Sequence, residues 1–430
     1  MGVLLINLPS SAWYRKEFTK GSGMPPLGLL YIATVLQKND IDVNLIDMTT
    51  TPMNKEEFTS LLVEKKPKII GISTYCESWI SLKVISAEIK RILPNAIVVA
   101  GGAFATFLKE EILNVTDVDI VSIGEGEYSF LKLSEYFIRG IGDFDDIPGI
   151  FYKNGEGKFV YDQVEVGRIK NLDELPFPNR DLVDVNAYTM PYTISTARGC
   201  PGACIFCSSR AYWGNRVYMR SAQNVFDEIM YLYKKYNTTY FQIVDDTFTA
   251  SRKRAVEVCE KLSNTGIQFL WGCESRADVI TPEFIKTLRK AGCNKIQFGL
   301  ESANNNILKE LKKHVTVEQI ENAVQLAHSE GMYITLSYIV GHAFDTKETI
   351  QETLDFANRM KEMYGASVLG SINTPFMGTE QYERRKELGI EIHNTDWDEF
   401  RLDNPNINTK NLSIDDLRHY NMIITEMARG

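Results

Sequence analysis

The predicted fold depends most on one stretch, Arg198-Gly199-Cys200-Pro201-Gly202-Ala203-Cys204-Ile205-Phe206-Cys207. Three of the seven cysteines fall in it, and all five histidines lie more than a hundred residues later. A structural zinc ion normally takes four protein ligands, whereas three thiolates on a cubane of four irons leave one iron open. The spacing favours a [4Fe–4S] cluster held by Cys200, Cys204 and Cys207, with structural zinc or inert thiols as alternatives.

Around this stretch, short apolar segments alternate with helix-length segments. Thr281-Pro282-Glu283 is typical of a first helical turn, and Thr316-Val317-Glu318-Gln319 fits a capping box. Six βα units predict a partial (β/α)6 barrel over residues 191–376, with its active site at the carboxyl ends of the strands. The strands are expected at Tyr192–Thr196, Tyr240–Asp245, Phe269–Cys273, Lys295–Leu300, Ile334–Val340 and Ser367–Asn373.

Residues 1–140 repeat the strand–helix rhythm and predict a separate doubly wound (Rossmann-like) parallel sheet. Ligands of such sheets bind at the carboxyl ends of the strands. The absence of G-x-G-x-x-G and Walker A motifs disfavours a plain dinucleotide or ATP site. The strands are expected at Val3–Leu8, Val43–Asp47, Ile69–Thr74, Ile97–Ala100 and Ile120–Ile123.

Two further segments complete the predicted α/β organisation. Residues 141–190 are expected to form a connector, because a hairpin signal at Asn154–Gly157 is followed by the helix-breaking Pro176-Phe177-Pro178. Residues 377–430 are expected to form a C-terminal helical and irregular segment, whose final helix begins at Leu412–Leu417.

Composition limits the function classes. The formal net charge of −9 argues against a nucleic-acid partner. No stretch approaches the ~20 apolar residues of a membrane span, and Met1–Pro9 lacks the basic start of a signal peptide. We therefore expect a cytoplasmic protein, without nucleic-acid or membrane partners, whose clustered cysteines serve metal binding or catalysis.

The spacing C-x-x-x-C-x-aromatic-C after a first barrel strand resembles the radical SAM (S-adenosylmethionine) superfamily. Further motifs resemble the subgroup with an N-terminal cobalamin (B12)-binding domain, and together they cover about residues 1–410. In the barrel they are Val244–Phe248, Gly272–Asp278, Phe298–Ser302 and Asn373–Thr379; before it they are Pro25–Leu29, Gly101-Gly102 and Gly124–Glu127.

The resemblance implies a SAM site around the open iron. Phe206 would lie near the adenine, and Arg276 would pair with the SAM carboxylate. The amino group would be placed by Asp245, Asp246 and Thr247, and the ribose or methionine end by Glu301 and Ser302. Blander interpretations remain open at this point: Asp245 and Asp246 as a helix N-cap pair, Glu301 as a surface carboxylate, and Arg276 as part of a structural ion pair.

The resemblance also implies cobalamin at the edge of the N-terminal sheet. That domain has no histidine and lacks D-x-H-x-x-G, so no domain histidine can ligate the cobalt. The cobalt would instead meet Tyr75, Cys76 or Trp79. The residues expected to bind cobalamin are Pro9, Ser73, Thr74, Tyr75, Gly101, Gly102, Gly124, Glu125 and Glu127.

Two segments depart from the subgroup's usual motifs. Gly101-Gly102-Ala103-Phe104 stands where relatives usually have Gly-Gly-Pro-His, and Gly341–Thr346 stands where they usually have Gly-Leu-Pro-Gly-Glu-Thr. His342 is either an acid–base group that faces the substrate or an exposed loop residue. Cys259 and Cys293 show no cluster spacing and are expected to be buried thiols.

The implied activity is cleavage of SAM at the cluster to give a 5′-deoxyadenosyl radical. The first hypothesis is a cobalamin-dependent methyltransferase acting on an unactivated carbon of a small-molecule or natural-product substrate. One alternative is a cyclase or ring-rearranging enzyme without net methyl transfer. Another is a radical SAM enzyme whose N-terminal sheet no longer binds cobalamin. A reductant such as flavodoxin or ferredoxin would supply the electron.

Overall fold

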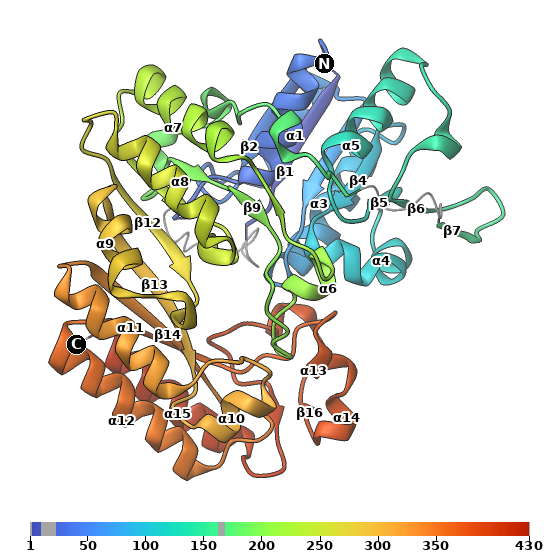
Figure 1. Cartoon of the computed structure of the whole chain (residues 1–430). Coiled ribbons are helices and arrows are strands. Elements are labelled where there is room, and N and C mark those ends of the chain that lie inside the picture. The colour runs from blue at the N-terminus through green and yellow to red at the C-terminus, as the bar shows by residue number, and fades with distance from the viewer. Residues whose placement is uncertain (1, 10–22, 162–167, 430) are drawn as a thin grey trace. The chain divides into compact units, whose positions relative to one another are not determined.

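The computed structural model describes residues 2–9, 23–161 and 168–429. The chain divides into two compact units, Met1–Pro191 and Tyr192–Gly430 (Figure 1). Each unit contains one large β-sheet whose parallel strands alternate with helices, as predicted. Among the described residues, no helix is long and apolar enough to cross a membrane.

The first unit is built on a seven-stranded sheet of order β2-β1-β3-β4-β5-β6-β7. The first five strands are parallel, and the apolar segments predicted to form them do so. The hairpin β6–β7 adds two antiparallel strands, which the sequence did not predict to join the sheet. The strands are β1 Val3–Asn7, β2 Val43–Asp47, β3 Ile69–Ser73, β4 Ile97–Gly101, β5 Ile120–Ser122, β6 Ile150–Lys153 and β7 Phe159–Tyr161.

Among the described residues, five α-helices accompany this sheet, and two hydrogen bonds join later segments of the unit to it. Tyr188 donates a hydrogen bond of 2.8 Å to the buried Asp47 at the end of β2, and the Asn179 amide donates to Thr34 in α1 at 2.8 Å. The helices are α1 Leu27–Lys38, α2 Lys55–Lys65, α3 Trp79–Ile92, α4 Ala103–Val115 and α5 Glu127–Ser134.

The second unit is the predicted partial barrel, a six-stranded parallel sheet of order β15-β14-β13-β12-β11-β8. Every strand lies where the sequence placed it. The strands are β8 Thr193–Ile194, β11 Tyr240–Ile243, β12 Leu270–Ser275, β13 Cys293–Glu301, β14 Tyr333–Val340 and β15 Ser367–Ile372; two small ribbons are formed by β9 Ala197–Arg198 with β10 Tyr218–Met219, and by β16 Glu391–Ile392 with β17 Ile407–Asn408.

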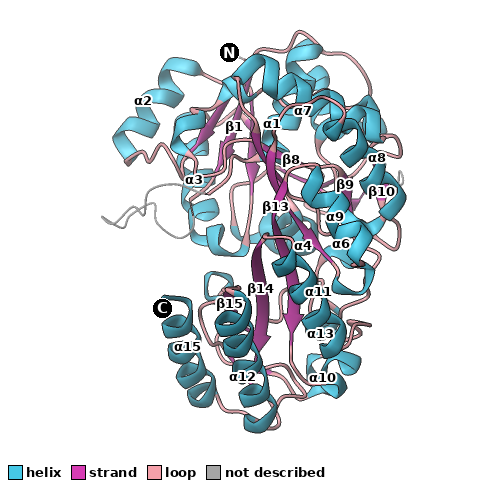
Figure 2. Ribbon diagram, turned by 60° about the vertical axis from the view of Figure 1, so that its left-hand side comes forward, coloured by secondary structure: helices cyan, strands magenta, loops and turns pink. Residues whose placement is uncertain are grey.

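Helices cover one face of this sheet, as Figure 2 shows for α9, α11, α12 and α15. The two helix starts predicted from the sequence are confirmed. Thr281 caps α9 ahead of Pro282, and Thr316 forms a capping box with Gln319 at α11. The helices are α6 Ser209–Trp213, α7 Ala222–Tyr236, α8 Arg252–Ser263, α9 Pro282–Lys290, α10 Asn305–Glu310, α11 Val317–Ser329, α12 Lys347–Tyr364, α13 Glu380–Glu383, α14 Arg385–Leu388 and α15 Ile414–Arg429.

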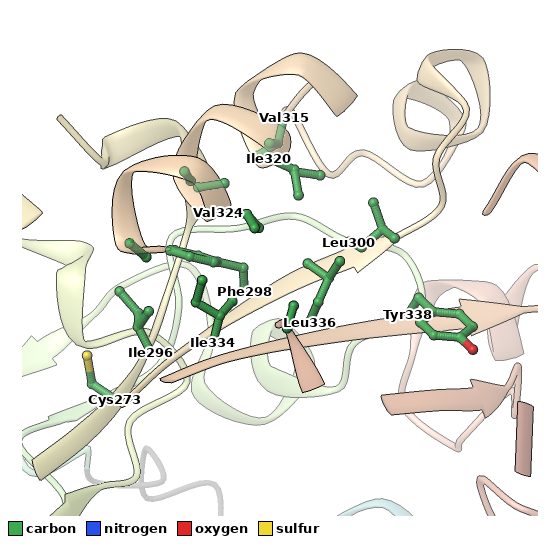
Figure 3. Packing of buried hydrophobic residues seen from close by; sticks show 14 of the residues in the cluster. Cys273, Ile296, Phe298, Leu300, Val315, Ile320, Val324, Ile334, Leu336 and Tyr338 are labelled. Carbon is green, nitrogen blue, oxygen red and sulfur yellow. The ribbon is translucent and has the colours of Figure 1, made fainter. Parts of the chain in front are cut away.

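The core of the second unit lies between the strands and these helices (Figure 3). Phe298 on β13 and Leu336 on β14 pack toward Ile320 and Val324 of α11. Alternate residues of a strand point to opposite faces, so Gly299 and Ser337 face the interior of the barrel. Cys259, Cys273 and Cys293 are buried in the core, with 4.0 Å between the sulfurs of Cys273 and Cys293. The expected burial of Cys259 and Cys293 is therefore confirmed.

Candidate functional site

The three predicted cluster ligands occupy one loop at the carboxyl end of β8. Gly202 lies between two of them: a Cβ built there would stand 3.4 Å from the Cys200 sulfur and 3.8 Å from the Cys204 sulfur. Its backbone N–H also donates to the Cys200 sulfur at 3.4 Å. A side chain at Gly202 would therefore enter the space beside both thiols, so this position keeps a cradle open.

The backbone of neighbouring elements holds this loop. The amide of Ile205 donates to the Leu311 carbonyl at 3.2 Å, and its own carbonyl accepts from the Gln381 amide at 2.9 Å. At the start of the loop, Gly199 has φ +93° and would bring a Cβ to 2.8 Å from the Arg216 carbonyl. The loop is thus fixed at both ends, and Cys207 receives a backbone hydrogen bond from Ser209 at 3.5 Å.

Two opposing effects act on the protonation of the three thiols. Desolvation by the surrounding protein raises the pKa of each thiol, and raises even that of the solvent-exposed Cys207 to about 11, while the charges of Arg276 and Lys313 lower the pKa of Cys200 and Cys204. Metal binding displaces such protons. Among the described residues, no three His, Cys, Asp or Glu side chains lie close enough together to hold a single metal ion. Three cysteine thiolates are instead the donor set of a cubane with one open iron.

Arg276 reaches the thiols from β12. A Cβ at Gly202 would lie 3.7 Å from Arg276 Nη1. The other guanidinium nitrogens bond Asp278 at 2.9 Å each, and Nη2 also donates to the carbonyls of Lys313 and His314. The structural ion pair considered from the sequence is therefore present, and it leaves Nη1 directed toward the loop.

Glu301 and Lys313 form an ion pair of 2.7 Å at the end of β13. Glu301 is 7% exposed, so its interpretation as a surface carboxylate is wrong. It has φ +59°, and the pairing of β13 with β14 shifts register there. A Cβ on Gly299 would stand 2.3 Å from the Glu301 carboxylate and 2.6 Å from the Lys313 amine. Gly299 therefore makes room for this pair.

The remaining predicted SAM residues divide into two groups. Asp246 is exposed and accepts a hydrogen bond of 2.6 Å from Ser209, just after Cys207. Phe206 packs at the edge of the core, 5.6 Å from the His342 ring. Thr247 and Ser302 are buried, and their hydroxyls lie 3.4 Å from the hydroxyls of Thr249 and Thr353, respectively.

Asp245 has a distinct environment. Its carboxylate accepts the backbone N–H groups of Thr196 and Ala197 and the Thr196 hydroxyl, and it lies 3.8 Å from Arg254. Desolvation by burial raises its pKa, and these partners oppose that shift. The N-cap interpretation of Asp245 and Asp246 is wrong, because Ser251 caps the helix that follows. Asp245 ties the end of β11 to the chain that enters the cysteine loop.

Two further side chains belong to the site and were not identified as site residues from the sequence. One is Lys313, in an ordinary Lys-Lys-His run. The other is Glu274, on the interior face of β12. Its carboxyl reaches solvent, yet protein surrounds it on most sides; this desolvation, with the charges of Asp246 and Glu301, raises its pKa to about 7. Among the described residues, Glu274 and Asp246 form no ion pair. The interior therefore offers carboxylates to a cationic ligand such as SAM.

His342 lies in a buried environment at the end of β14. It is 0% exposed, so the exposed-loop interpretation is wrong. Both ring nitrogens are buried without a hydrogen-bond partner in the described part of the chain, and burial lowers the pKa of the ring to about 3. Its backbone N–H donates to Asp345 at 2.9 Å.

The N-terminal sheet gathers its predicted cobalamin residues along one edge. Its first five strands have the order 2-1-3-4-5, for which ligands bind at the carboxyl ends near the β1/β3 switch point. Pro9 follows β1, and Ser73 ends β3. Thr74 donates twice to the Gly101 carbonyl, at 2.9 and 3.0 Å.

Gly102 leaves space at the carboxyl edge of this sheet because it has no side chain. Gly102 has φ +100°, and a Cβ there would lie 3.1 Å from the Thr74 carbonyl. Thr106 donates to the Gly102 carbonyl at 2.9 Å and accepts from the Gly124 amide at 3.0 Å. These contacts link the ends of three strands through backbone groups, so the edge can admit a large flat ligand closely.

The other residues considered for cobalamin differ in burial and in their contacts within the N-terminal unit. Glu125 accepts the Ile169 N–H at 2.9 Å, and Glu127 is buried in the first turn of α5. Trp79, considered for the cobalt face, is 2% exposed and packs edge-on against Phe104 at 5.8 Å. Tyr75 is 57% exposed.

Comparison with known proteins agrees with both units. Residues 194–357 match the radical SAM superfamily, and residues 19–134 match the B12 binding domain. The uncharacterized methyltransferase PH0819 of Pyrococcus horikoshii is 30% identical over 388 residues, 89% of this chain and 83% of that protein. The anaerobic magnesium-protoporphyrin IX monomethyl ester cyclase of Rubrivivax gelatinosus is 28% identical, over 89% of this chain and 69% of its own.

A solved structure shares the whole fold. The radical SAM methyltransferase TsrM of Kitasatospora setae, solved with cobalamin and a [4Fe–4S] cluster, superposes with a TM-score of 0.75 at 18% identity, over 92% of this chain and 78% of its own. A radical SAM domain implies a [4Fe–4S] cluster, SAM, a reductant and a small-molecule substrate, and a B12-binding domain implies cobalamin. This chain is an enzyme that belongs to the radical SAM superfamily and carries a B12-binding domain.

Proposed function

We propose that the enzyme is a cobalamin-dependent radical SAM methyltransferase that methylates an unactivated carbon of a small-molecule or natural-product substrate. The observation that carries the proposal is the cradle at Gly202, where two thiols and the Arg276 guanidinium converge at the end of the first barrel strand. The same chain has a B12-type sheet whose edge is built of backbone and glycine. The names of PH0819 and TsrM support methyl transfer.

The residues around the thiols would bind and orient SAM. Arg276 Nη1 would face its carboxylate, since the rest of the guanidinium is held by Asp278. Asp246 and Glu274 would balance its ammonium and sulfonium charges. When bound, the cluster supplies the electron that cleaves SAM and cobalamin supplies a carrier for the methyl group.

Asp245 and the Glu301–Lys313 ion pair would shape the site without touching the reacting atoms. Asp245 fastens the chain that enters the cysteine loop, and the Glu301–Lys313 pair lies at the end of β13. Both are nearly buried, so their charges act in a low dielectric and hold fixed positions. This rigidity would keep SAM in one orientation.

The test uses anaerobically reconstituted enzyme with cobalamin, a chemical reductant and SAM labelled in its methyl group. The proposal expects 5′-deoxyadenosine together with label in a small-molecule product, read by mass spectrometry of candidate substrates. Absence of deoxyadenosine under strong reductant would refute the radical SAM assignment of the site.

The alternative is a cyclase or ring-rearranging activity, supported by the 28% identity to the Rubrivivax gelatinosus cyclase. The same experiment separates the two functions. A cyclase forms deoxyadenosine and a product whose mass reports ring closure, and no label reaches that product. The substrate itself follows from neither the fold nor the cofactors.

A further inference from the structure

An open groove of about 720 Å³ in the second unit is lined in part by Ile205 of the cysteine loop. Its apolar part includes Ile205, Ala343 and Leu388. Charged side chains from α10 and from the segments around α14 form its rim. They are Lys309, Glu310, Lys312, Arg384, Glu387 and Lys410.

One residue that lines the groove is adjacent in the chain to a predicted cluster ligand. Ile205, in its wall, is bonded covalently to Cys204, and the Cys204 sulfur lies 3.9 Å from the carbonyl oxygen of Lys312. The Ile205 amide is also hydrogen-bonded to Leu311 at 3.2 Å. A molecule seated in the groove would therefore be separated from the cluster by a few covalently bonded atoms.

The groove differs in charge from the chain as a whole. Its lining contains four cations and two carboxylates, whereas the chain has a formal net charge of −9. Glu380, nearby, is engaged by both Lys312 and Arg384 at 2.5–2.7 Å. Lys309 is exposed and forms no ion pair with the described residues. The cations of this lining outnumber its carboxylates, which favours the binding of an acidic protein here.

We propose that this groove docks the acidic one-electron carrier protein, of the flavodoxin or ferredoxin kind, that reduces the cluster. The proposal rests on the proposed function, because it names where that enzyme receives its electron. The carrier is oxidised by one electron and the cluster takes up the same electron; no bond forms or breaks. Electron-transfer encounters are small and transient, so a local groove with a charged rim suffices.

The test compares charge variants of the cluster-loaded enzyme, with reduced flavodoxin as the probe. Lys309→Glu combined with Lys410→Glu avoids the cations that pair with Glu380. The rate of cluster reduction, followed by stopped-flow absorbance at low ionic strength, should fall about tenfold or more. The affinity for flavodoxin, measured by calorimetry, should fall in parallel. The matched control is Lys253→Glu on α8, whose side chain is 89% exposed, and it should leave both quantities unchanged.

The opposite substitution protects the test against a folding defect. Glu310→Lys makes the rim more basic, and it should raise the flavodoxin rate and steepen its dependence on salt. A small neutral photoreductant should reduce the cluster at the same rate in all variants. Deoxyadenosine formation with that photoreductant tests the proposed function separately. Equal flavodoxin rates in the wild type, the double variant and Glu310→Lys, or an equal loss in Lys253→Glu, would overturn the docking proposal.

Discussion

The two units present different chemistry at the same structural position, the carboxyl edge of a parallel sheet. In the N-terminal unit the ends of β3 and β4 at this edge present backbone groups and small residues, with Gly102 at φ +100° and Thr74 hydrogen-bonded to Gly101. In the barrel it consists of thiols, carboxylates and cations, such as Cys204, Glu274 and Arg276. The difference teaches that a bulky cofactor with its own reactive centre needs space, whereas a cluster and its sulfonium ligand need donors and charges.

The largest expected effect is at the donors. Cys204→Ala should abolish the cluster, because two thiolates no longer hold the cubane. Iron and sulfide content, the absorbance of the reconstituted protein and deoxyadenosine yield should all drop to background. Cys259→Ala, which removes a thiol buried in the core, is the control and should retain the cluster. Retention of a full cluster in Cys204→Ala would contradict the assignment.

The next effect concerns charge in the barrel. Lys313→Met leaves Glu301 nearly buried and unpaired, which should lower the free energy of unfolding by about 3 kcal/mol. The urea midpoint measures it. Lys312→Met is the control, because its pair with Glu380 is 43% and 34% exposed and should contribute less than about 1 kcal/mol. Equal losses in both variants would show that burial of the pair is unimportant.

A smaller effect, on cobalamin affinity, is expected at the carboxyl edge of the N-terminal sheet. Gly102→Ala places a side chain at φ +100° and 3.1 Å from the Thr74 carbonyl, which costs about 1–3 kcal/mol. Cobalamin affinity, from the corrin absorbance in titrations, should fall about tenfold, equivalent to ~1.4 kcal/mol. Gly28→Ala in α1 meets nothing within 4 Å and is the matched control. Unchanged affinity in Gly102→Ala would remove this edge from the cobalamin site.

The smallest effect is a gain in stability at His342. His342→Leu removes two unsatisfied buried nitrogens and should raise the free energy of unfolding by about 1 kcal/mol near neutral pH. Burial lowers the folded pKa of the ring to about 3. Below the ordinary pKa near ~6.5, only the unfolded chain binds the proton, so the wild type loses stability as pH falls toward 3.

The advantage of the leucine variant should therefore grow on acidification, as measured by denaturation at pH 7 and pH 5. His419→Leu, at an exposed position, is the control and should show no such trend. A variant that is less stable than the wild type at both pH values would mean that the ring has a partner.

Local rules determined much of what the sequence could predict. The eleven expected parallel strands form where short apolar segments alternate with helix-length segments, and the caps at Thr281 and Thr316 act within one helical turn. The cysteine spacing likewise identified the donors of one loop, since three thiols within eight positions are close wherever that loop lies.

Only the tertiary structure decided which distant groups meet. Lys313 joins Glu301 where the pairing of β13 with β14 shifts register, and Asp245 at the end of β11 accepts the backbone N–H groups of Thr196 and Ala197, which follow β8. His342 is buried because the end of β14 packs against Phe206, a loop more than a hundred residues earlier. Local patterns encode secondary structure and chemically distinctive motifs, but the partner and burial of a single charge depend on long-range packing, which no short window of sequence contains.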